Sequence, residues 1–249
     1  MSLEFLISKI QKNNFLLIGR AGVDIYPDPP GTKTENTNKY VTHLGGSSAN
    51  MGVQLTKYGG SCSLLTRVSN DALGKFALNQ LDYYGVKRDL VKLEDNESRI
   101  SLAIVESTIE DHQSIIYRHK AADLFLNKSD IENSNLQEYE CILITGTSLA
   151  AEPSRSSVLY ALELAKEKNI PVIMDIDYRP YTWESADKAK QIYNLACSYC
   201  SGIIGNDDEF AVLSGNYDDG LRYAKKISKN CDLVIYKMGE KGSITFANN

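Results

Sequence analysis

Short apolar runs alternate with amphipathic segments along the second half of the chain. The apolar runs cover residues 141–146, 170–177, 202–206 and 231–237, and segments with helical spacing lie between them at 154–169, 185–200, 207–215 and 218–230. Nearly continuous apolar strands that alternate with helices are typical of a mainly parallel sheet with both faces covered. The pattern therefore predicts an α/β fold, a doubly wound, mainly parallel sheet with helices on both faces.

The first half of the chain combines this pattern with segments that have only strand character. It predicts strands at 15–20 and 62–68, a helix that starts after Gly45 and Gly46, and a second helix at 71–85. Three more segments, 86–93, 99–106 and 113–119, contain β-branched and alternating residues, so we expect them to be strands of a separate small sheet.

Composition narrows the class of protein. The 249 residues are enough for one large domain, alone or with a small accessory sheet. A net charge of −5 with 43% hydrophobic residues argues against a nucleic-acid partner. Glu4, Lys9 and Lys12 interrupt the apolar N-terminal stretch, which argues against a signal core or a membrane span. We therefore expect a cytoplasmic protein without a membrane partner.

The five cysteines are spread over the chain and lie mostly in apolar surroundings. This favours buried thiols over a disulfide framework. Cys197 and Cys200 form a single C-x-x-C inside a segment with helical spacing. A metal or redox role is the alternative, although a structural zinc ion normally needs four ligands.

Polar side chains recur where the predicted strands end. They are Asp24 after the first strand, Asp175, Asp177 and Arg179 after the strand near 173, Asn206 and Glu209 after the strand near 204, and Lys237 with Gly239 and Gly242 after the last. Ligands on parallel sheets bind at the carboxyl ends of the strands, so these groups are expected to share one cleft. A helix cap is the alternative for any single group.

Gly45 and Gly46 directly precede a helix, which is conformationally costly unless a tight turn or a close approach requires glycine. We expect Ser47 or Ser48 to cap this helix through its hydroxyl group. Asn50 lies in the first turn and needs a polar partner. Two interpretations remain open: a strand-turn-helix junction, or a site where the backbone approaches a small molecule.

Six motifs occur in the order found in one family. They are GRAGVD, GGSSAN, RVSNDALG, MDIDYRPYTW, NDDEF and KMGEKGS, within about Phe15 to Phe246. In this order they resemble the ribokinase-like (PfkB) carbohydrate kinases. The resemblance implies a single domain over residues 1–249, with a small β-sheet lid formed by about 25–44 and 86–118.

Two further motifs, YRHKAADL from Tyr117 and the segment from Asp177 to Trp183, look most like the family members that act on 5-dehydro-2-deoxygluconate or 2-keto-3-deoxygluconate. The resemblance therefore implies ATP-dependent phosphorylation of the terminal hydroxyl of an acidic keto-deoxy sugar, most of all 5-dehydro-2-deoxy-D-gluconate in inositol breakdown. Alternatives are a fructose or nucleoside kinase of the same family, or a catalytically inactive sugar-binding protein.

The resemblance also implies which residues bind the sugar. Asp24 would accept hydrogen bonds from sugar hydroxyls, while Gly45, Gly46 and Asn50 would line the pocket. The list is completed by Arg118 and Arg179 for the substrate carboxylate, because guanidinium is a planar, bidentate donor. A turn role for Asp24 and surface ion pairs for the arginines are the alternatives. Asp177 stands where many family members have Asn.

For the nucleotide side, the resemblance implies that Asn206 and Glu209 organise Mg²⁺ through water around the phosphates of ATP. A capping box at the start of a helix is an alternative that is compatible with this role. Lys237, Gly239 and Gly242 resemble the start of the nucleotide-binding segment, with a plain β-turn as the alternative.

One family motif is absent from the chain. No glycine-rich G-A-G-D turn precedes Asn249, so the resemblance implies that the catalytic base lies beyond this residue. We expect either a C-terminal part that is not included in the sequence, a genuine fragment, or a truncated relative that only binds sugar. The lid strands are expected to pair two subunits in a homodimer.

Overall fold

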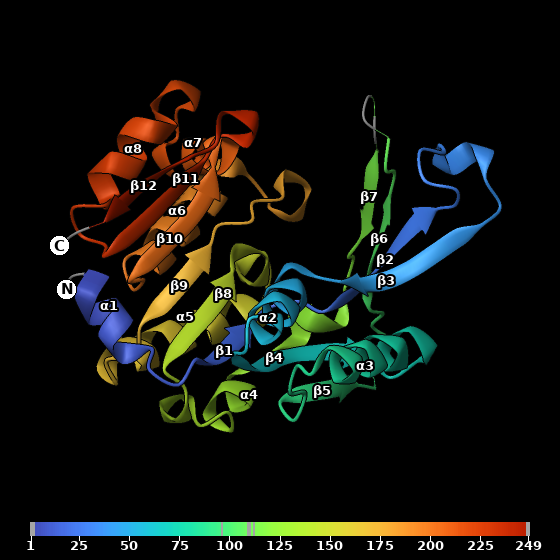
Figure 1. Cartoon of the computed structure of the whole chain (residues 1–249), viewed down its shortest axis with the longest axis horizontal. Coiled ribbons are helices and arrows are strands. Elements are labelled where there is room, and N and C mark those ends of the chain that lie inside the picture. The colour runs from blue at the N-terminus through green and yellow to red at the C-terminus, as the bar shows by residue number, and fades with distance from the viewer. Residues whose placement is uncertain (1–2, 96, 109–110, 112, 248–249) are drawn as a thin grey trace.

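The computed structural model describes residues 3–95, 97–108, 111 and 113–247, which contain a large and a small β-sheet (Figure 1). The large sheet has the strand order β12 (Ser243–Ala247), β11 (Leu233–Lys237), β10 (Gly202–Asn206), β9 (Val172–Asp175), β8 (Cys141–Thr145), β1 (Asn14–Ile18), β4 (Ser61–Ser69) and β5 (Val91–Glu94). Neighbouring strands are parallel except β11 and β12. This confirms the predicted mainly parallel α/β fold.

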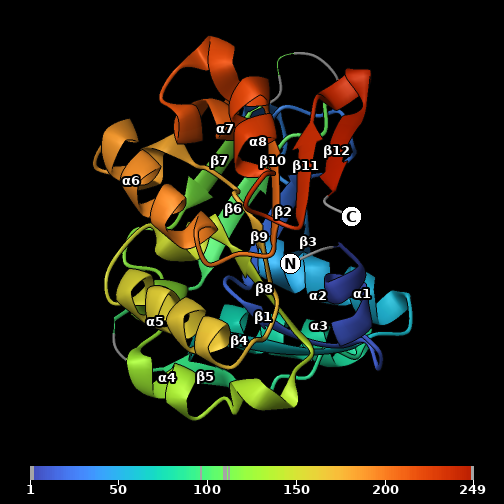
Figure 2. The same cartoon turned by 90° about the vertical axis from the view of Figure 1, so that its left-hand side faces the viewer.

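Helices cover both faces of the large sheet (Figure 2). The helices are α1 (Leu3–Lys9), α2 (Ser47–Lys57), α3 (Ala72–Tyr84), α4 (Lys128–Glu132), α5 (Ser154–Glu167), α6 (Ala186–Cys197), α7 (Asp207–Ser214) and α8 (Gly220–Ile227). The apolar sequence of β1 is explained by cores on both sides of the strand. Leu16 packs in the core beneath α4 to α8, and Leu17 packs in the core beneath α2 and α3. Successive residues of a strand point to opposite faces, and here both faces are buried.

The small sheet has the order β3 (Tyr40–Gly45), β2 (Gly22–Pro27), β6 (Ser101–Val105) and β7 (Ser114–Tyr117), and it extends away from the large sheet in Figure 1. The predicted lid range 86–118 needs a correction. Its first strand, β5, pairs in parallel with β4 at the edge of the large sheet. Alternating polarity identifies a strand but does not say which sheet edge it joins.

The two predicted helix starts have different outcomes. The Asp71 side chain accepts from the backbone N–H groups of Leu73 and Gly74 at 3.0 and 2.9 Å, so it caps α3 at the start of the helix predicted for 71–85. The serine cap of α2 was wrong, because its N-cap residue is Gly46. Ser47 instead donates to the Asp177 carboxylate, 130 residues away in the sequence.

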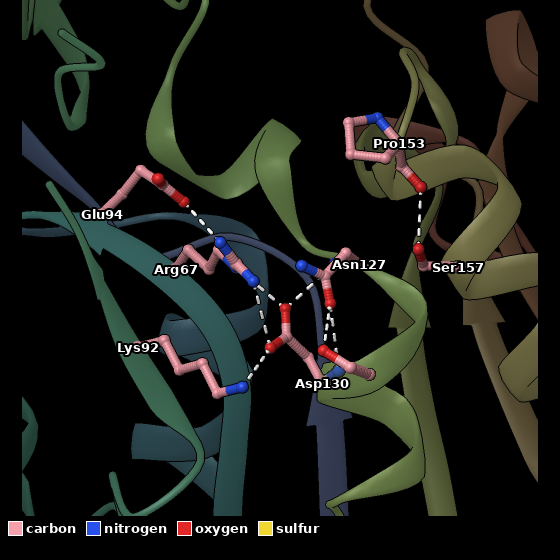
Figure 3. A network of polar contacts seen from close by, with 8 residues as sticks. Arg67, Lys92, Glu94, Asn127, Asp130, Pro153 and Ser157 are labelled. Atoms are coloured by element: carbon pink, nitrogen blue, oxygen red, sulfur yellow. Dashed lines mark hydrogen bonds and ion pairs between the residues drawn. The ribbon is translucent and has the colours of Figure 1, made fainter. Parts of the chain in front are cut away.

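A network of charged side chains fastens β4 and β5 to α4 (Figure 3). Arg67 donates from Nε and Nη2 to the two carboxylate oxygens of Asp130, at 2.8 and 3.2 Å, and from Nη1 to Glu94 at 2.5 Å. Lys92 Nζ lies 2.6 Å from Asp130 Oδ1. Asp130 also accepts from the backbone N–H of Asn127, which completes a capping box at the start of α4. We call these side chains the Arg67 network.

All five cysteines are free thiols, and all but Cys197 are buried. Burial raises the pKa of the Cys141 thiol to about 12. Such thiols are neutral and weak nucleophiles, as expected for core residues. Along the described part of the chain, no helix combines the length and the apolar character needed to cross a membrane.

Candidate active site

A cavity of about 980 Å³ lies at the carboxyl ends of the central strands, beneath the small sheet. One wall comes from the end of β1, from β2 and from the start of α2. The lid side is formed by Ala103, Val105 and Ile116 of β6 and β7, and the opposite wall comes from the loop after β9 and the start of α7. This position is the one that the parallel-sheet rule predicts for a ligand.

The cavity brings together six of the residues singled out from the sequence. They are Asp24, Gly46, Asn50, Arg179, Asn206 and Glu209. Seven others are not among the lining residues: Gly45, Arg118, Asp175, Asp177, Lys237, Gly239 and Gly242. The predicted polar groups thus converge only in part.

Asp24 and the two glycines form one packed unit. A Cβ atom on Gly45 would lie 2.2 Å from Asp24 Oδ1, and one on Gly46 would lie 2.3 Å from the Arg20 carbonyl oxygen. Gly46 also has φ of +94°, a backbone conformation that favours glycine. The protein itself therefore requires both glycines: Gly45 at the end of β3 leaves room for the Asp24 side chain of β2, and Gly46 lets the segment after β1 approach the start of α2.

Asp24 and Asn50 offer polar groups to the cavity. Burial raises the pKa of the Asp24 carboxyl, and the nearby Arg20 and His43 oppose this shift. The Asn50 side chain is exposed and has no hydrogen bond to any described residue. Both side chains are therefore available to hydrogen-bond a ligand.

Asp177 organises the loop after β9. Asp177 is 4% exposed; its carboxylate accepts from the Ser47 hydroxyl and forms an ion pair with Arg179, whose Nη2 lies 2.7 Å from Asp177 Oδ1. The Arg179 side chain is 41% exposed and faces the cavity. Asp177 thus joins α2 to this loop and holds the Arg179 guanidinium at the cavity wall.

Arg118 has a different setting from Arg179. It is 8% exposed, and its Nε and Nη2 both donate to Asp123 Oδ2, with Nε at 3.1 Å. Its Nη1 is buried without a hydrogen-bond partner among the described residues. The ion pair with Asp123 shows what fixes this side chain, and its predicted role towards a substrate carboxylate stays a prediction.

Arg20 was missed by the sequence analysis as a site residue. It lines the cavity, is 7% exposed, and donates from Nη1 to the Ser101 hydroxyl at 2.8 Å. Burial lowers the pKa of its guanidinium, and the neighbouring charge of Arg118 adds to this shift. The available signal was its place in GRAGVD, where a charged residue comes directly after a buried strand.

Asn206 and Glu209 form the capping box that the sequence offered as an alternative. Asn206 Oδ1 accepts from the Glu209 N–H at 2.9 Å, and Glu209 Oε2 accepts from the Asn206 N–H at 2.7 Å. Glu209 Oε1 accepts from the Tyr178 N–H at 3.2 Å. Burial raises the pKa of Glu209, with the nearby Asp175 carboxylate contributing.

The contacts of Glu209 indicate how a metal ion would fit beside it. Because both Glu209 oxygens already accept backbone hydrogen bonds, the residue suits an ion held through water better than a direct ligand. Across the residues that the structure describes, no three His, Cys, Asp or Glu side chains form a cluster able to hold a metal directly.

The predicted nucleotide segment lies at the turn between β11 and β12. Met238 N–H donates to the Gly242 carbonyl at 2.8 Å, and Gly239 and Gly242 have φ of +56° and +86°. Lys237 Nζ lies 3.6 Å from Asp175 Oδ1. The geometry is that of a hairpin turn, which was the alternative interpretation, and the nucleotide role remains a prediction.

Comparisons with known proteins point consistently to one family. The model of the pfkB family carbohydrate kinases matches residues 12–249. A 5-dehydro-2-deoxygluconokinase of Photobacterium profundum is 32% identical over 239 residues, which cover 94% of this chain and 72% of that protein. A protein of the same name from Mesomycoplasma hyopneumoniae is 34% identical, with 92% of this chain and 70% of that protein covered.

Solved structures share the fold. A fructokinase of Vibrio cholerae O395 with fructose, ADP and calcium bound has a TM-score of 0.82 at 25% identity, with 95% of this chain and 74% of that chain covered. A 2-dehydro-3-deoxygluconokinase of Thermotoga maritima has a TM-score of 0.79 at 21% identity, with coverage of 89% and 71%. Family model, relatives and fold agree, and the chain belongs to the pfkB family of carbohydrate kinases.

Proposed function

We propose that the protein is an ATP-dependent kinase that phosphorylates the terminal hydroxyl of 5-dehydro-2-deoxy-D-gluconate, in inositol catabolism. The observation that carries this proposal is a cavity in which the Asp24 carboxylate and the Arg179 guanidinium line the same space. A carboxylate that accepts from hydroxyls and a guanidinium that binds an acid group together suit a sugar acid. Relatives at 32–34% identity carry the name of this kinase, which supports the choice.

On the sugar side, the proposal assigns hydroxyl binding to Asp24 and Asn50, with the backbone of the Gly45–Gly46 turn beside them. Arg179 binds the carboxylate from the cavity wall, where Asp177 holds it. Arg118, already paired with Asp123, contributes its positive charge to the same region. The apolar side chains of β6 and β7 cover the sugar and reduce its contact with water.

On the nucleotide side, the proposal assigns ATP to the segment of Lys237, Gly239 and Gly242. When bound, Mg²⁺ would neutralise phosphate charge, and Asn206 and Glu209 would hold it through water. Phosphoryl transfer depends mainly on positioning and charge stabilisation, so the contribution of this chain is to hold sugar and phosphates in place.

The test is ADP release by the purified complete gene product with three sugars: 5-dehydro-2-deoxy-D-gluconate, 2-keto-3-deoxygluconate and D-fructose. We expect the highest kcat/KM with the first sugar. A preference for fructose would support the fructokinase alternative, which the Vibrio cholerae neighbour favours. Calorimetric binding of the sugars runs in parallel, because binding without ADP release would indicate a sugar-binding protein and contradict the kinase proposal.

A cytoplasmic homodimer belongs to the same proposal. The edge strands β3 and β7 of the small sheet expose Tyr40, Val41, Ile115 and Tyr117, each more than a third exposed. Unpaired edges with exposed apolar side chains are suited to pairing between subunits. Light scattering after gel filtration tests this, and a monomeric mass would contradict it.

A further inference from the structure

Arg20 and Arg179 line the cavity, Arg118 lies near Arg20 outside the lining, and the three differ in how their charge is balanced. Arg118 donates two hydrogen bonds to Asp123, and Arg179 forms an ion pair with Asp177. The Arg20 side chain makes a single hydrogen bond within the described chain, from Nη1 to the Ser101 hydroxyl, and no ion pair. Of these three, Arg20 is the one without a carboxylate partner.

Because Arg20 is buried, the lack of a carboxylate partner costs free energy. The side chain is 7% exposed, and its Nε is buried without a hydrogen-bond partner among the described residues. A buried charge is expensive unless it is paired, and guanidinium does not lose its proton to escape the cost. The folded protein therefore keeps a cation at the cavity wall at a cost that an incoming anion would reduce.

No neighbouring carboxylate forms an ion pair with Arg20 in the described structure. Asp123 and Asp177 pair with the other two arginines. Asp24 also forms no ion pair with Arg20, and burial raises the pKa of its carboxyl. Their charges reach Arg20 only at a distance, and the nearby Arg118 cation opposes them.

We propose that Arg20 is a specificity-determining residue that binds the carboxylate of the sugar acid and selects it over neutral sugars. This rests on the proposed function and adds a residue to it. The Ser101 hydroxyl on β6 accepts from Nη1 and fixes one end of the guanidinium, and the side chain lines the cavity. A planar fork of donors matches a carboxylate, which a point charge does not.

The backbone around Arg20 explains how the side chain is kept in place. Its carbonyl oxygen accepts from the Ala49 N–H at 3.2 Å and packs against Gly46, at the start of α2. Arg20 is thus clamped between α2 and β6, one element from the core and one from the small sheet. A preorganised donor of this kind loses little conformational entropy when the ligand binds.

The test compares dissociation constants of 5-dehydro-2-deoxy-D-gluconate and D-fructose, measured by calorimetry on the purified protein. Arg20→Lys keeps the charge and removes the fork, and we expect it to weaken the acid about tenfold and fructose less than about threefold. Arg67→Lys is the matched control, because Arg67 is a mostly buried arginine outside the cavity. It should leave the ratio of the two constants unchanged.

Ser101→Ala keeps the proposal testable if Arg20→Lys does not fold, which thermal melts will show. It removes the one hydrogen bond that orients Arg20, and we expect about a threefold loss of affinity for the acid alone. Equal losses for both sugars would mean that Arg20 is merely structural and would overturn the inference.

The outcomes also separate this inference from the proposed function. If the unmodified protein prefers the acid and both variants keep that preference, only the role of Arg20 is refuted. If the unmodified protein shows no preference for the acid, the proposed substrate is wrong and the role of Arg20 is refuted with it.

Discussion

Two clusters of arginine and carboxylate groups lie at the carboxyl ends of strands in the large sheet, and they differ in how the arginine charge is paired. In the Arg67 network, Arg67 contacts two carboxylates, and Lys92 adds a second cation to Asp130 (Figure 3). At the cavity, Arg20 has no ion-pair partner in the described structure. Both arginines are largely shielded from water, so burial alone does not separate structural from functional roles.

The difference between them is whether the protein itself satisfies the charge. A buried ion pair in which each guanidinium nitrogen donates a hydrogen bond fixes the relative position of the elements that carry it, here β4, β5 and α4. A buried cation without a partner contributes nothing comparable to the fold, and its cost falls when an anion binds. We therefore expect mutations in the Arg67 network to change mainly stability, and mutations at the cavity to change mainly ligand affinity.

Arg67→Ala should have the largest effect on stability. It removes the guanidinium and leaves two carboxylates near each other with only Lys92, so we expect the free energy of unfolding to fall by about 3 kcal/mol. Urea unfolding followed by circular dichroism measures this. The ratio of acid to fructose affinity should not change, and a change would show that the Arg67 network extends to the cavity.

Asp24→Asn should have the next largest effect, now on affinity. The substitution removes the charge that strengthens hydrogen bonds from sugar hydroxyls, so we expect about tenfold weaker binding of both sugars. The folded-state pKa of Asp24 is raised above the usual 3.8, so its ionisation destabilises the fold as the pH rises through that raised pKa. The variant should therefore be at least as stable as the unmodified protein at neutral pH. Calorimetry and thermal melts measure both effects, and a less stable variant would contradict the assignment.

Asp130 should show the opposite pH dependence from Asp24. Burial alone would raise its pKa, but the hydrogen bonds from Arg67 and Lys92 outweigh burial and lower it. Its contribution to stability is therefore present above the usual pKa of 3.8 and is lost as the pH falls through the folded-state pKa. Urea unfolding in the acid range should show this loss in the unmodified protein and a smaller loss in Asp130→Asn. Equal slopes for the two proteins would mean that Asp130 is not the titrating group.

The sequence predicted the large sheet well because the signal is local. Leu16, Leu17 and Ile18 are all buried, so the strand is apolar throughout whichever neighbours it has. The assignment of Val91–Glu94 to the lid failed, since the choice of sheet depends on pairing with β4 and not on the segment itself. Local polarity predicts elements, and tertiary contacts decide their partners.

The candidate site was predicted less completely, for a similar reason. Arg179 follows β9, where the parallel-sheet rule places ligands, and Asp24 lies in β2 shortly after β1; both line the cavity. The Ser47 hydroxyl contacts Asp177 instead of capping α2, a contact between distant parts of the chain that spacing does not reveal. Whether Arg20 has a carboxylate partner is likewise a property of the folded structure.

Glu106→Gln should have the smallest effect. It tests whether the small sheet contains a carboxylate whose charge the protein itself satisfies. The Thr34 N–H donates to Glu106 Oε1 at 2.8 Å, and the Gln113 N–H donates to Oε2 at 3.0 Å. Lys33 Nζ lies 3.3 Å from Oε2. These contacts join the loop between β2 and β3 to the hairpin of β6 and β7.

The hydrogen bond from the Thr34 N–H, together with those from Gln113 and Lys33, holds the pKa of Glu106 at about 2, below its usual 4.5. Since the folded-state pKa is lowered, the stabilisation is present above pH 4.5 and is lost as the pH falls towards 2. Thermal melts across this interval should show a shallower decline for Glu106→Gln than for the unmodified protein, with sugar affinity at neutral pH unchanged, because Glu106 does not line the cavity. If the variant instead weakens sugar binding selectively for the acid, the small sheet takes part in substrate selection, and the contrast between the Arg67 network and Arg20 would no longer separate stability from specificity.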